Sequence, residues 1–393
     1  MRSRLLFLLP LLLTCSLQAQ KGIINKGALI VVSGNAMITA QGSGASYTNL
    51  SAASVPGRIS LNGKFYLQGD WLNNADGGTV FINPSNTGEV IFQGNSAQVV
   101  GGNQPTIFGK MTINNPSDVF LNNTITLEGD LLLGAGILHL GDDHLVLGNW
   151  SAIGGIPSTE AMVVTDGTGE LRKKFAAPGS FLFPVGDNTD IPEYSPVQVH
   201  FTGGSFAGDA SASVRVINAK HPLNSSTVNY LTRYWSLSQN GISDFTAEVL
   251  FVYTDADIQG DESLLYGGQY SAPVWKKLNA VNTADNTFTA SVNTFSDFTA
   301  GESSAFAATI VPGEEASFRI YAWRNFIIVS TDEPEKNGPY IGVYNVAGQL
   351  VGTHTLQKER INRIATYLPE GIYFVRMAGK ERVYTVRLFL TEK

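Results

Sequence analysis

The densest group of titratable side chains in the sequence is Asp142-Asp143-His144, and His139 lies a few residues before it. Two neighbouring carboxylates could act as general acid and base on a polysaccharide, or they could bind a cation. Adjacent aspartates between two short apolar runs are more typical of a turn, in which the carboxylates accept hydrogen bonds from backbone N–H groups. The sequence favours the turn, with polysaccharide cleavage as the alternative.

His144 begins a run that continues with Leu145, Val146 and Leu147. Side chains alternate between the two faces of a strand. If both leucines face the interior of the protein, His144 points outward and should tolerate replacement by alanine.

A second acidic group comprises Asp255, Asp257, Asp261 and Glu262. Its Asp-x-Asp start is similar to that of a calcium-binding loop, but the twelfth position holds Tyr266, where such a loop needs a bidentate glutamate. The sequence therefore predicts a solvated acidic loop that does not bind calcium.

Two tryptophans, Trp71 and Trp150, each follow a Gly-Asp or a Gly-Asn dipeptide. An exposed indole on a regular β surface could stack on a sugar ring. A tryptophan in such a place could also pack into the core or along a sheet edge. Both residues are candidates for glycan stacking, with core packing as the alternative.

Other sequence patterns that are typical of catalytic or metal sites are incomplete in this chain. The segment closest to a nucleophile elbow, Gly203-Gly204-Ser205-Phe206-Ala207, lacks the final glycine. The five histidines do not have the spacing of a metal site. We therefore expect a protein that is not an enzyme and that has no catalytic residue, metal ligand or cofactor.

The composition indicates the fold class. The chain has 393 residues, of which 43% are hydrophobic and 15% are charged, enough for two or three packed domains. Its 41 glycines and 16 prolines are typical of many short strands joined by turns. The expected fold class is all-β.

The first twenty residues resemble a secretory signal peptide. Arg2 and Arg4 precede the apolar run of residues 5–13, and a short polar stretch ends at Gln20. The apolar run is too short to span a bilayer as a helix, and no later stretch is long enough. Cys15, the only cysteine, leaves lipidation in place of cleavage after Ala19 as an alternative.

Residues 21–155 consist of short alternating runs that are separated by Gly-Asp or Gly-Asn dipeptides, in which glycine could supply the positive φ of a tight turn. The segment LNGKFYLQGDWL at 61–72 shares six positions with LNNTITLEGDLL at 121–132. A separation of sixty residues holds about three rungs of a stacked β coil. The sequence predicts a β-solenoid, or β-helix-like, region here, with meandering antiparallel sheets as the alternative.

The remainder of the chain divides into three parts. Longer alternating strands over residues 156–302 predict an antiparallel β-sandwich. Residues 303–316 are rich in alanine and serine and read as a linker. Six or seven short strands over residues 317–393 predict a small Ig-like sandwich.

The net charge of residues 317–393 differs in sign from that of the preceding part of the chain, residues 21–316, which we call the body. Residues 21–316 contain 13 basic and 26 acidic side chains, a net charge of −13, whereas residues 317–393 contain 11 and 7, a net charge of +4. The difference suggests a C-terminal module with its own partner. The acidic body argues against nucleic acid as a ligand.

The C-terminal part contains the run IGVYNVAGQLV at 341–351, then LPEGIYFVR at 368–376, then a final β run. This order resembles the type A C-terminal sorting domain of the type IX secretion system of Bacteroidota. A Pro-Asn-Pro opening found in many members is absent, and Arg387 stands where a lysine is common. The residues that carry the sorting motif are Val343, Tyr344, Asn345, Gly348, Gly371, Tyr373, Val375 and Arg376.

Two of these motif residues have a backbone explanation. Gly348 fits a turn position, and Gly371 would let the chain turn sharply from Pro369 into the following strand.

The resemblance implies Sec export, passage through the outer membrane with the tail as address label, and removal of the tail. Its partner would be the type IX machinery, and the mature chain would be secreted or held on the outer-membrane surface without a transmembrane segment. We therefore expect a non-enzymatic protein that is adhesin-like or structural, with a surface glycan or host ligand as a further partner. The alternatives are a glycan-binding module and a polysaccharide-degrading β-helix enzyme.

Overall fold

The structure is a computed structural model that describes residues 22–77, 79–82, 88–272, 274–306, 318–323, 325–331, 340–378 and 383–391. It divides into two compact units, Met1–Ala307 and Ala308–Lys393. The fold is all-β, which confirms the predicted class. The predicted signal peptide over residues 1–20, with Cys15, and residues 307–316 of the predicted linker lie outside the described residues. In the described part of the chain, no helix has the length and apolar character needed to cross a membrane.

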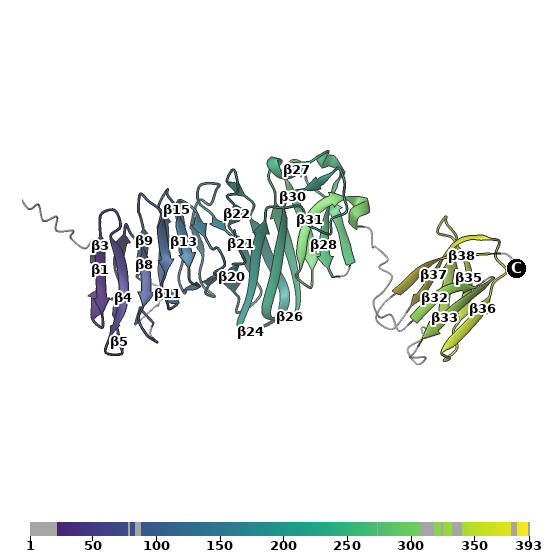
Figure 1. Ribbon diagram of the computed structural model, residues 1–393, viewed down its shortest axis with the longest axis horizontal. Helices are drawn as coiled ribbons and strands as arrows, with labels where there is room; N and C mark the ends of the chain where they lie inside the picture. Colours follow the sequence, from purple (N-terminus) through teal and green to yellow (C-terminus); the bar gives the residue numbers. More distant parts are fainter. Residues whose placement is uncertain are drawn as a thin grey trace, which may run out of the picture. The chain divides into compact units, whose positions relative to one another are not determined.

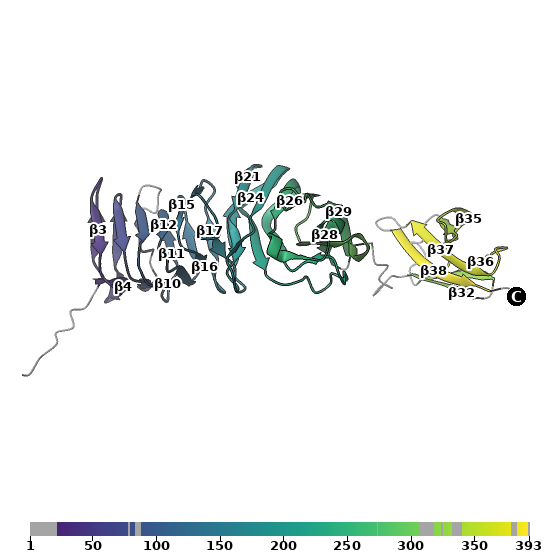
Figure 2. The same cartoon turned by 90° about the horizontal axis from the view of Figure 1, so that it is seen from above.

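The first unit begins with a β-solenoid of about seven turns, which confirms the solenoid prediction (Figures 1 and 2). Its strands form three parallel stacks that successive turns visit in the same order. The first stack is β1 (Gly22–Lys26), β4 (Ser46–Ala52), β8 (Trp71–Asn74), β10 (Gln98–Gly101), β13 (Val119–Asn122), β16 (Leu138–His139), β19 (Val163–Val164) and β22 (Val185–Asp187). The second consists of two separate sheets, β2 (Leu29–Val32) with β6 (Arg58–Leu61), and β11 (Thr106–Phe108), β14 (Ile125–Leu127), β17 (Leu145–Leu147) and β20 (Leu171–Lys174). The third is β3 (Met37–Ala40), β7 (Lys64–Leu67), β9 (Glu89–Phe92), β12 (Lys110–Asn114), β15 (Leu131–Ala135) and β18 (Ile153–Gly155), and a short β5 (Val55–Pro56) pairs with β4.

In-register pairing stacks like side chains inside the coil. Ile125 of β14 lies beside Leu145 of β17, and Leu127 lies beside Leu147; all four are almost fully buried. Burying one such aliphatic side chain contributes about 1.5–3 kcal/mol. The inward leucines confirm the alternation that was predicted for the run after His144.

The corner glycines serve two purposes, of which one was predicted. Gly34, Gly102 and Gly141 have a positive φ, of +56°, +114° and +56°, as expected of a tight turn, whereas the glycines of the other Gly-Asp and Gly-Asn dipeptides in residues 21–155 do not. A Cβ on Gly69 would come within 2.5 Å of the carbonyl carbon of Ala45 in the preceding turn, and one on Gly129 within 2.8 Å of the oxygen of Gly109. These glycines let neighbouring turns approach closely, because any side chain would hold the two backbones apart.

The sequence repeat proves to be a repeated corner and not a repeated turn. The copy at 61–72 centres on β7 in the third stack, whereas the copy at 121–132 centres on β14 in the second. The tenth residue of each copy is an aspartate that bonds to the next turn: Asp70 Oδ1 accepts from the N–H of Val99 at 2.9 Å, and Asp130 Oδ1 from that of Ala152 at 3.1 Å. The same hydrogen bond at two corners explains why the two segments are alike.

The solenoid continues past residue 155, where its end was expected. β17 pairs in parallel with β20, and β19 pairs in parallel with β22. β20 then pairs antiparallel with β24 (Val197–Ile217). Because this pairing merges the second stack into the antiparallel region, a single hydrophobic core runs through both.

The rest of the first unit is antiparallel, as predicted for this region. β24 and β26 (Tyr234–Val252) form a long hairpin (Figure 1). The other strands are β21 (Ser180–Phe183), β23 (Glu193–Tyr194), β25 (Tyr230–Leu231), β27 (Ile258–Gln259), β28 (Leu265–Ser271), β29 (Val274–Ala280), β30 (Thr287–Val292) and β31 (Asp297–Glu302), with the 3-10 helices η1 (Asp255–Asp257), η2 (Glu262–Leu264) and η3 (Ser303–Phe306).

The start of the predicted linker belongs to this first unit. In η3, Phe306 is 1% exposed, and its ring centroid lies 4.7 Å from that of Trp275. Burial of this aromatic side chain fixes residues 303–306 against the antiparallel region.

The second unit is a small β-sandwich, as predicted for residues 317–393. One sheet contains β32 (Phe318–Trp323), β33 (Phe326–Thr331) and β36 (Ile361–Ala365), and the other contains β35 (Leu350–Thr355), β34 (Tyr340–Tyr344), β37 (Gly371–Ala378) and β38 (Val383–Leu390). Ile327 and Val329 of the first sheet share a core with Val343, Val375 and Met377 of the second. β35 forms although its sequence, LVGTHT, has no regular apolar alternation.

Candidate functional site

The two halves of the sorting-like motif lie side by side in the second unit. β34 and β37 pair antiparallel, with Val343 opposite Val375 and Tyr344 opposite Phe374. Val343 and Val375 are fully buried in the core. Two segments about thirty residues apart in the sequence therefore form one continuous surface and one continuous core.

The turn after β34 is organised by Asn345. Its Oδ1 accepts hydrogen bonds from the N–H groups of Ala347 and Gln349, both at 3.0 Å, and its Nδ2 donates to Gln349 Oε1. Gly348 has φ +76°, a left-handed backbone that favours glycine. The turn role predicted for Gly348 is confirmed.

In the second half of the motif, the side chain of Tyr373 holds the segment that leads into β37, and Gly371 makes no comparable contribution. The hydroxyl of Tyr373 donates to the carbonyl of Pro369 at 3.0 Å, which ties the entry of β37 to the preceding loop. Gly371 has no left-handed φ, and a Cβ there would meet only Tyr373 at an ordinary 3.7 Å. The chain bends at Glu370, directly before β37, but the conformation of Gly371 itself gives no backbone reason for a glycine.

A groove of about 510 Å³ lies on the outer face of the four-stranded sheet. It is lined by Tyr344, Asn345, Val346, Gly348, Phe374, Arg376 and Thr385. The ring of Tyr344 lies over Gly342, where a Cβ would approach Tyr344 Cε2 to 3.0 Å. Gly342 pairs across the strands with Arg376, so the tyrosine ring and the guanidinium border the same hollow. Four of the eight predicted motif residues line this groove, and Val343, Tyr373 and Val375 are buried behind it.

Comparison with known proteins decides what this unit is. Residues 324–391 match the family described as "Secretion system C-terminal sorting domain". The match supports a type IX secretion cargo protein. No curated protein and no solved structure matches the chain, and the rest of it is not assigned to a family.

In the solenoid, the Asp142 cluster has the turn geometry that the sequence favours. Asp142 Oδ1 accepts from the N–H of Thr168 at 2.9 Å and from its hydroxyl at 3.0 Å. These two hydrogen bonds lower the pKa of the Asp142 carboxyl below its usual value. The carboxylate therefore holds the next turn of the coil at an exposed corner.

His144 is less free than predicted. It is half-buried, its Nδ1 accepts from the N–H of Glu170 at 3.1 Å, and its Nε2 lies 2.9 Å from Arg172 Nη2. Burial, together with the positive charge of Arg172, lowers the pKa of His144. The prediction that His144 points freely outward and tolerates alanine overlooked Glu170 and Arg172, which belong to the next turn.

His139 is enclosed by two carboxylates that the sequence did not associate with it. Its Nδ1 lies 3.0 Å from Asp166 Oδ2, its Nε2 lies 3.5 Å from Asp118 Oδ2, and the ring of Phe120 stacks on it at 4.4 Å. Burial favours the protonated form of Asp166, but hydrogen bonds from His139 and from the N–H of Gly141 outweigh it and lower the pKa of Asp166. In-register stacking of β13 and β16 brings Phe120 and His139 together, so only a correct strand register could have revealed the group.

The carboxylates of the acidic group at 255–262 do not converge. Asp255 accepts from Asn286 at 2.6 Å, Asp261 from the N–H of Ser263 at 3.0 Å, and Glu262 from the hydroxyl of Tyr253 at 2.7 Å. Asp257 is 1% exposed, which differs from the predicted solvated loop. It turns inward because it pairs with the buried Arg233.

Arg233 is the centre of a buried ionic cluster that sequence reasoning missed. Its guanidinium contacts Asp187, Glu193 and Asp257, and it is fully buried. Burial raises the pKa of Glu193, although the Thr254 hydroxyl and Arg233 act in the opposite direction. Asp187 belongs to β22, the last parallel strand of the first stack, and Glu193 belongs to β23, which pairs antiparallel with β22. The cluster therefore ties the end of the coil to the antiparallel region.

The two tryptophans proposed for glycan stacking have opposite environments. Trp71 is 0% exposed, its ring lies 4.4 Å from that of Tyr47, and its Nε1 donates to Thr106. It cannot reach a sugar, because β8 turns its first side chain inward. Trp150 is 84% exposed and stays a candidate.

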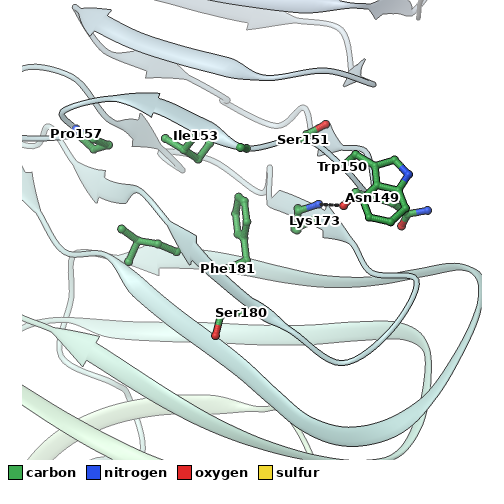
Figure 3. A pocket seen from close by; sticks show the side chains of 10 residues that line it. Asn149, Trp150, Ser151, Ile153, Pro157, Lys173, Ser180 and Phe181 are labelled. Atoms are coloured by element: carbon green, nitrogen blue, oxygen red, sulfur yellow. Dashed lines mark hydrogen bonds between the residues drawn. The ribbon is translucent and has the colours of Figure 1, made fainter. Parts of the chain in front are cut away.

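Trp150 borders a hollow of about 410 Å³ at the end of the third stack (Figure 3). β18 is the last strand of that stack. β21, which follows β19 and β20 in the chain, pairs with β24 and not with β18, and the hollow lies between β18 and β21. The hollow is lined by Asn149, Trp150, Ser151, Ala152, Ile153, Pro157, Lys173, Ser180, Phe181 and Leu182.

Lys173 forms the inner end of this hollow. Its ammonium donates to the carbonyl of Asn149 at 2.8 Å (Figure 3). It also donates to the carbonyl of Gly148 at 2.5 Å. Burial lowers the pKa of Lys173 to about 8. With its donors directed at backbone oxygens, the lysine closes the corner of the coil.

Ser205, at the centre of the elbow-like segment, lies within the long strand β24. A nucleophile elbow needs a sharp turn from a strand into a helix. The segment therefore lacks the geometry that would expose and activate a nucleophilic serine.

Proposed function

We propose that this protein is a non-enzymatic, adhesin-like component of the cell surface or the secreted fraction, delivered by the type IX machinery. The observation that carries the proposal is a sorting domain at the C-terminal end of a chain whose body is a long β-solenoid. A stacked coil presents an extended, regular surface that suits binding to another surface or to a polymer.

The titratable groups of the solenoid support a non-enzymatic role. Asp142, His139 and His144 each bond to a neighbouring turn, at Thr168, Asp166 and Glu170. A general acid or base needs a lone pair or proton directed at a substrate. Asp142, His139 and His144 instead direct these lone pairs and protons at other residues of the protein.

Delivery is tested with the full chain and with a chain that ends at Phe306, both expressed in a host with a working type IX system. We expect the full chain on the surface or in the medium, and the shortened chain in the periplasm. Export of the full chain from a strain that lacks the machinery would contradict the proposal.

The absence of catalysis is tested on the purified protein. Binding to a glycan array and release of reducing sugar are measured on the same set of polysaccharides. Binding without sugar release is the expected result. Turnover that disappears in a folded Asp142→Ala variant would instead establish an enzyme.

A second candidate function, glycan binding, is favoured by one observation. Trp150 is 84% exposed beside a hollow whose volume of about 410 Å³ is within the range of small-ligand sites. An indole face stacks on the apolar face of a sugar ring. Trp150→Ala should abolish array binding, whereas Tyr367→Ala, which removes another exposed aromatic side chain, should leave it unchanged.

A further inference from the structure

The outer face of the four-stranded sheet in the sorting domain has a distinct chemistry. Its outward side chains include Tyr344, Ile372, Phe374, Arg376, Thr385, Arg387 and Phe389, which alternate with buried neighbours along β34, β37 and β38. Among these described side chains, the charged groups are two arginines and no acid. The face is thus apolar, aromatic and cationic.

The arginines are available for a partner. Arg376 and Arg387 are both exposed, and neither forms an ion pair with a described residue. Arg387 lies opposite Phe374 across the strands. Arg376 lies opposite Gly342, the residue over which the ring of Tyr344 lies. A guanidinium beside an aromatic ring can bind a carboxylate in bidentate fashion while its neighbours contact apolar groups.

The apolar part of this face is unusually exposed. Ile372 and Phe389 are cross-strand partners with exposed fractions of 43% and 54%, and Val346 at the groove rim is 72% exposed. Exposed apolar side chains that surround a groove are typical of a surface that another protein covers.

We propose that this groove is the surface through which the type IX machinery holds the sorting domain, and that its occupant is a protein segment with a carboxylate next to an apolar side chain. The inference rests on the proposed function and adds to it the face and the chemistry of recognition. Charge complementarity defines the occupant, because Arg376 in the groove and Arg387 on the same face of the sheet favour an acidic partner and repel a basic one. Phe374 and Tyr344 form the floor on which the apolar neighbour of that carboxylate packs.

The test uses the full chain in a host with a working type IX system. Arg376→Glu reverses the charge in the groove, and Arg376→Gln removes it. The matched control is Arg319→Glu, an exposed arginine in β32 of the other sheet of the same sandwich. The measured quantity is the ratio of protein outside the outer membrane to protein in the periplasm, with the melting temperature of each purified variant as a check of folding.

We expect Arg376→Glu to lower the exported ratio by about tenfold or more, Arg376→Gln to lower it less, and Arg319→Glu to leave it unchanged. Equal export of Arg376→Glu and the wild type would overturn the inference, and so would an equal loss in Arg319→Glu.

Two further outcomes distinguish this inference from the proposed type IX delivery and from binding of the groove to a membrane. Export of the wild type from a strain that lacks the machinery would defeat the proposed function itself. Binding of the purified full chain to vesicles of anionic lipid, lost in Arg376→Glu, would replace the protein partner with a membrane and overturn the choice of occupant.

Discussion

The Nε of Arg233 donates to both carboxylate oxygens of Asp257, at 2.8 and 2.9 Å, and both side chains are almost fully buried. The same guanidinium contacts Asp187 and Glu193 at the end of the solenoid. A single buried cation therefore joins the coil to the antiparallel region.

Removing Asp257 should be costly, because the change leaves part of a buried guanidinium unpaired. We expect Asp257→Ala to lower the free energy of unfolding by about 3–5 kcal/mol, measured by urea denaturation. The control is Asp255→Ala, two residues away and exposed, which should cost about 0.5 kcal/mol or less. Similar losses in the two variants would contradict the structural role of the cluster.

Calcium should not stabilise the acidic group at 255–262. Asp255, Asp261 and Glu262 accept hydrogen bonds from three different partners, and Asp257 turns inward to Arg233. A calcium site needs six to eight oxygens directed at one point. We expect no change in melting temperature with millimolar calcium; a rise that is absent in Asp255→Ala would show this to be wrong.

How far the sequence could predict the structure is illustrated by Trp71 and Trp150. Both follow a similar dipeptide, but Trp71 begins strand β8 and faces inward, whereas Trp150 lies in the turn between β17 and β18 and faces solvent. Alternation and corner dipeptides predict a coil, because they reflect local backbone geometry. These patterns do not determine the residue at which each strand begins after a corner. A shift of one residue exchanges the side chains that face the core with those that face solvent.

The candidate sites show the same limit. The sorting motif was recognisable because order and spacing in sequence carry it, and the structure then brings Tyr344 and Arg376 to one groove. The contacts of Arg233 and His139 join residues from different strands, and nothing local in the sequence marks them. The contacts of His139 follow from the register of β13 and β16, and those of Arg233 join residues between 24 and 46 positions apart in the sequence.

Asp142→Ala should loosen one corner of the coil without affecting any chemistry. Thr168 in the next turn would lose the acceptor for both its N–H and its hydroxyl. We expect a small fall in melting temperature and faster hydrogen exchange at the amide of Thr168. The control is Asp209→Ala, which removes another exposed carboxylate, one that pairs with Lys174 on the surface, and should leave that amide unchanged. An unchanged exchange rate of the Thr168 amide in Asp142→Ala would show that the Asp142 carboxylate does not hold the two turns together.

His144 should make the stability of the solenoid depend on pH. Its pKa is lowered in the folded protein, so the folded state binds a proton less readily than the unfolded chain does. Its contribution is full above the unfolded pKa of about 6.5 and is lost as pH falls through the lower folded value. His144→Ala should cost about 1 kcal/mol at pH 7.5, and this difference from the wild type should shrink as the solution is acidified. A cost that stays constant or grows from pH 7.5 to 5 would contradict the assignment.

The two motif glycines of the sorting domain should respond differently to alanine. Gly348 has φ +76°, a region in which an L-residue other than glycine is strained by about 1 kcal/mol, so Gly348→Ala should lower the stability of the domain by that amount. Gly371 has no left-handed φ, and a Cβ there would meet Tyr373 at an ordinary 3.7 Å, so Gly371→Ala should change the stability by about 0.5 kcal/mol or less. Scanning calorimetry of the full chain checks both, because the sorting domain has its own core and should unfold in a transition of its own. If Gly371→Ala lowers that transition as much as Gly348→Ala does, the entry to β37 has a backbone requirement that its described conformation lacks.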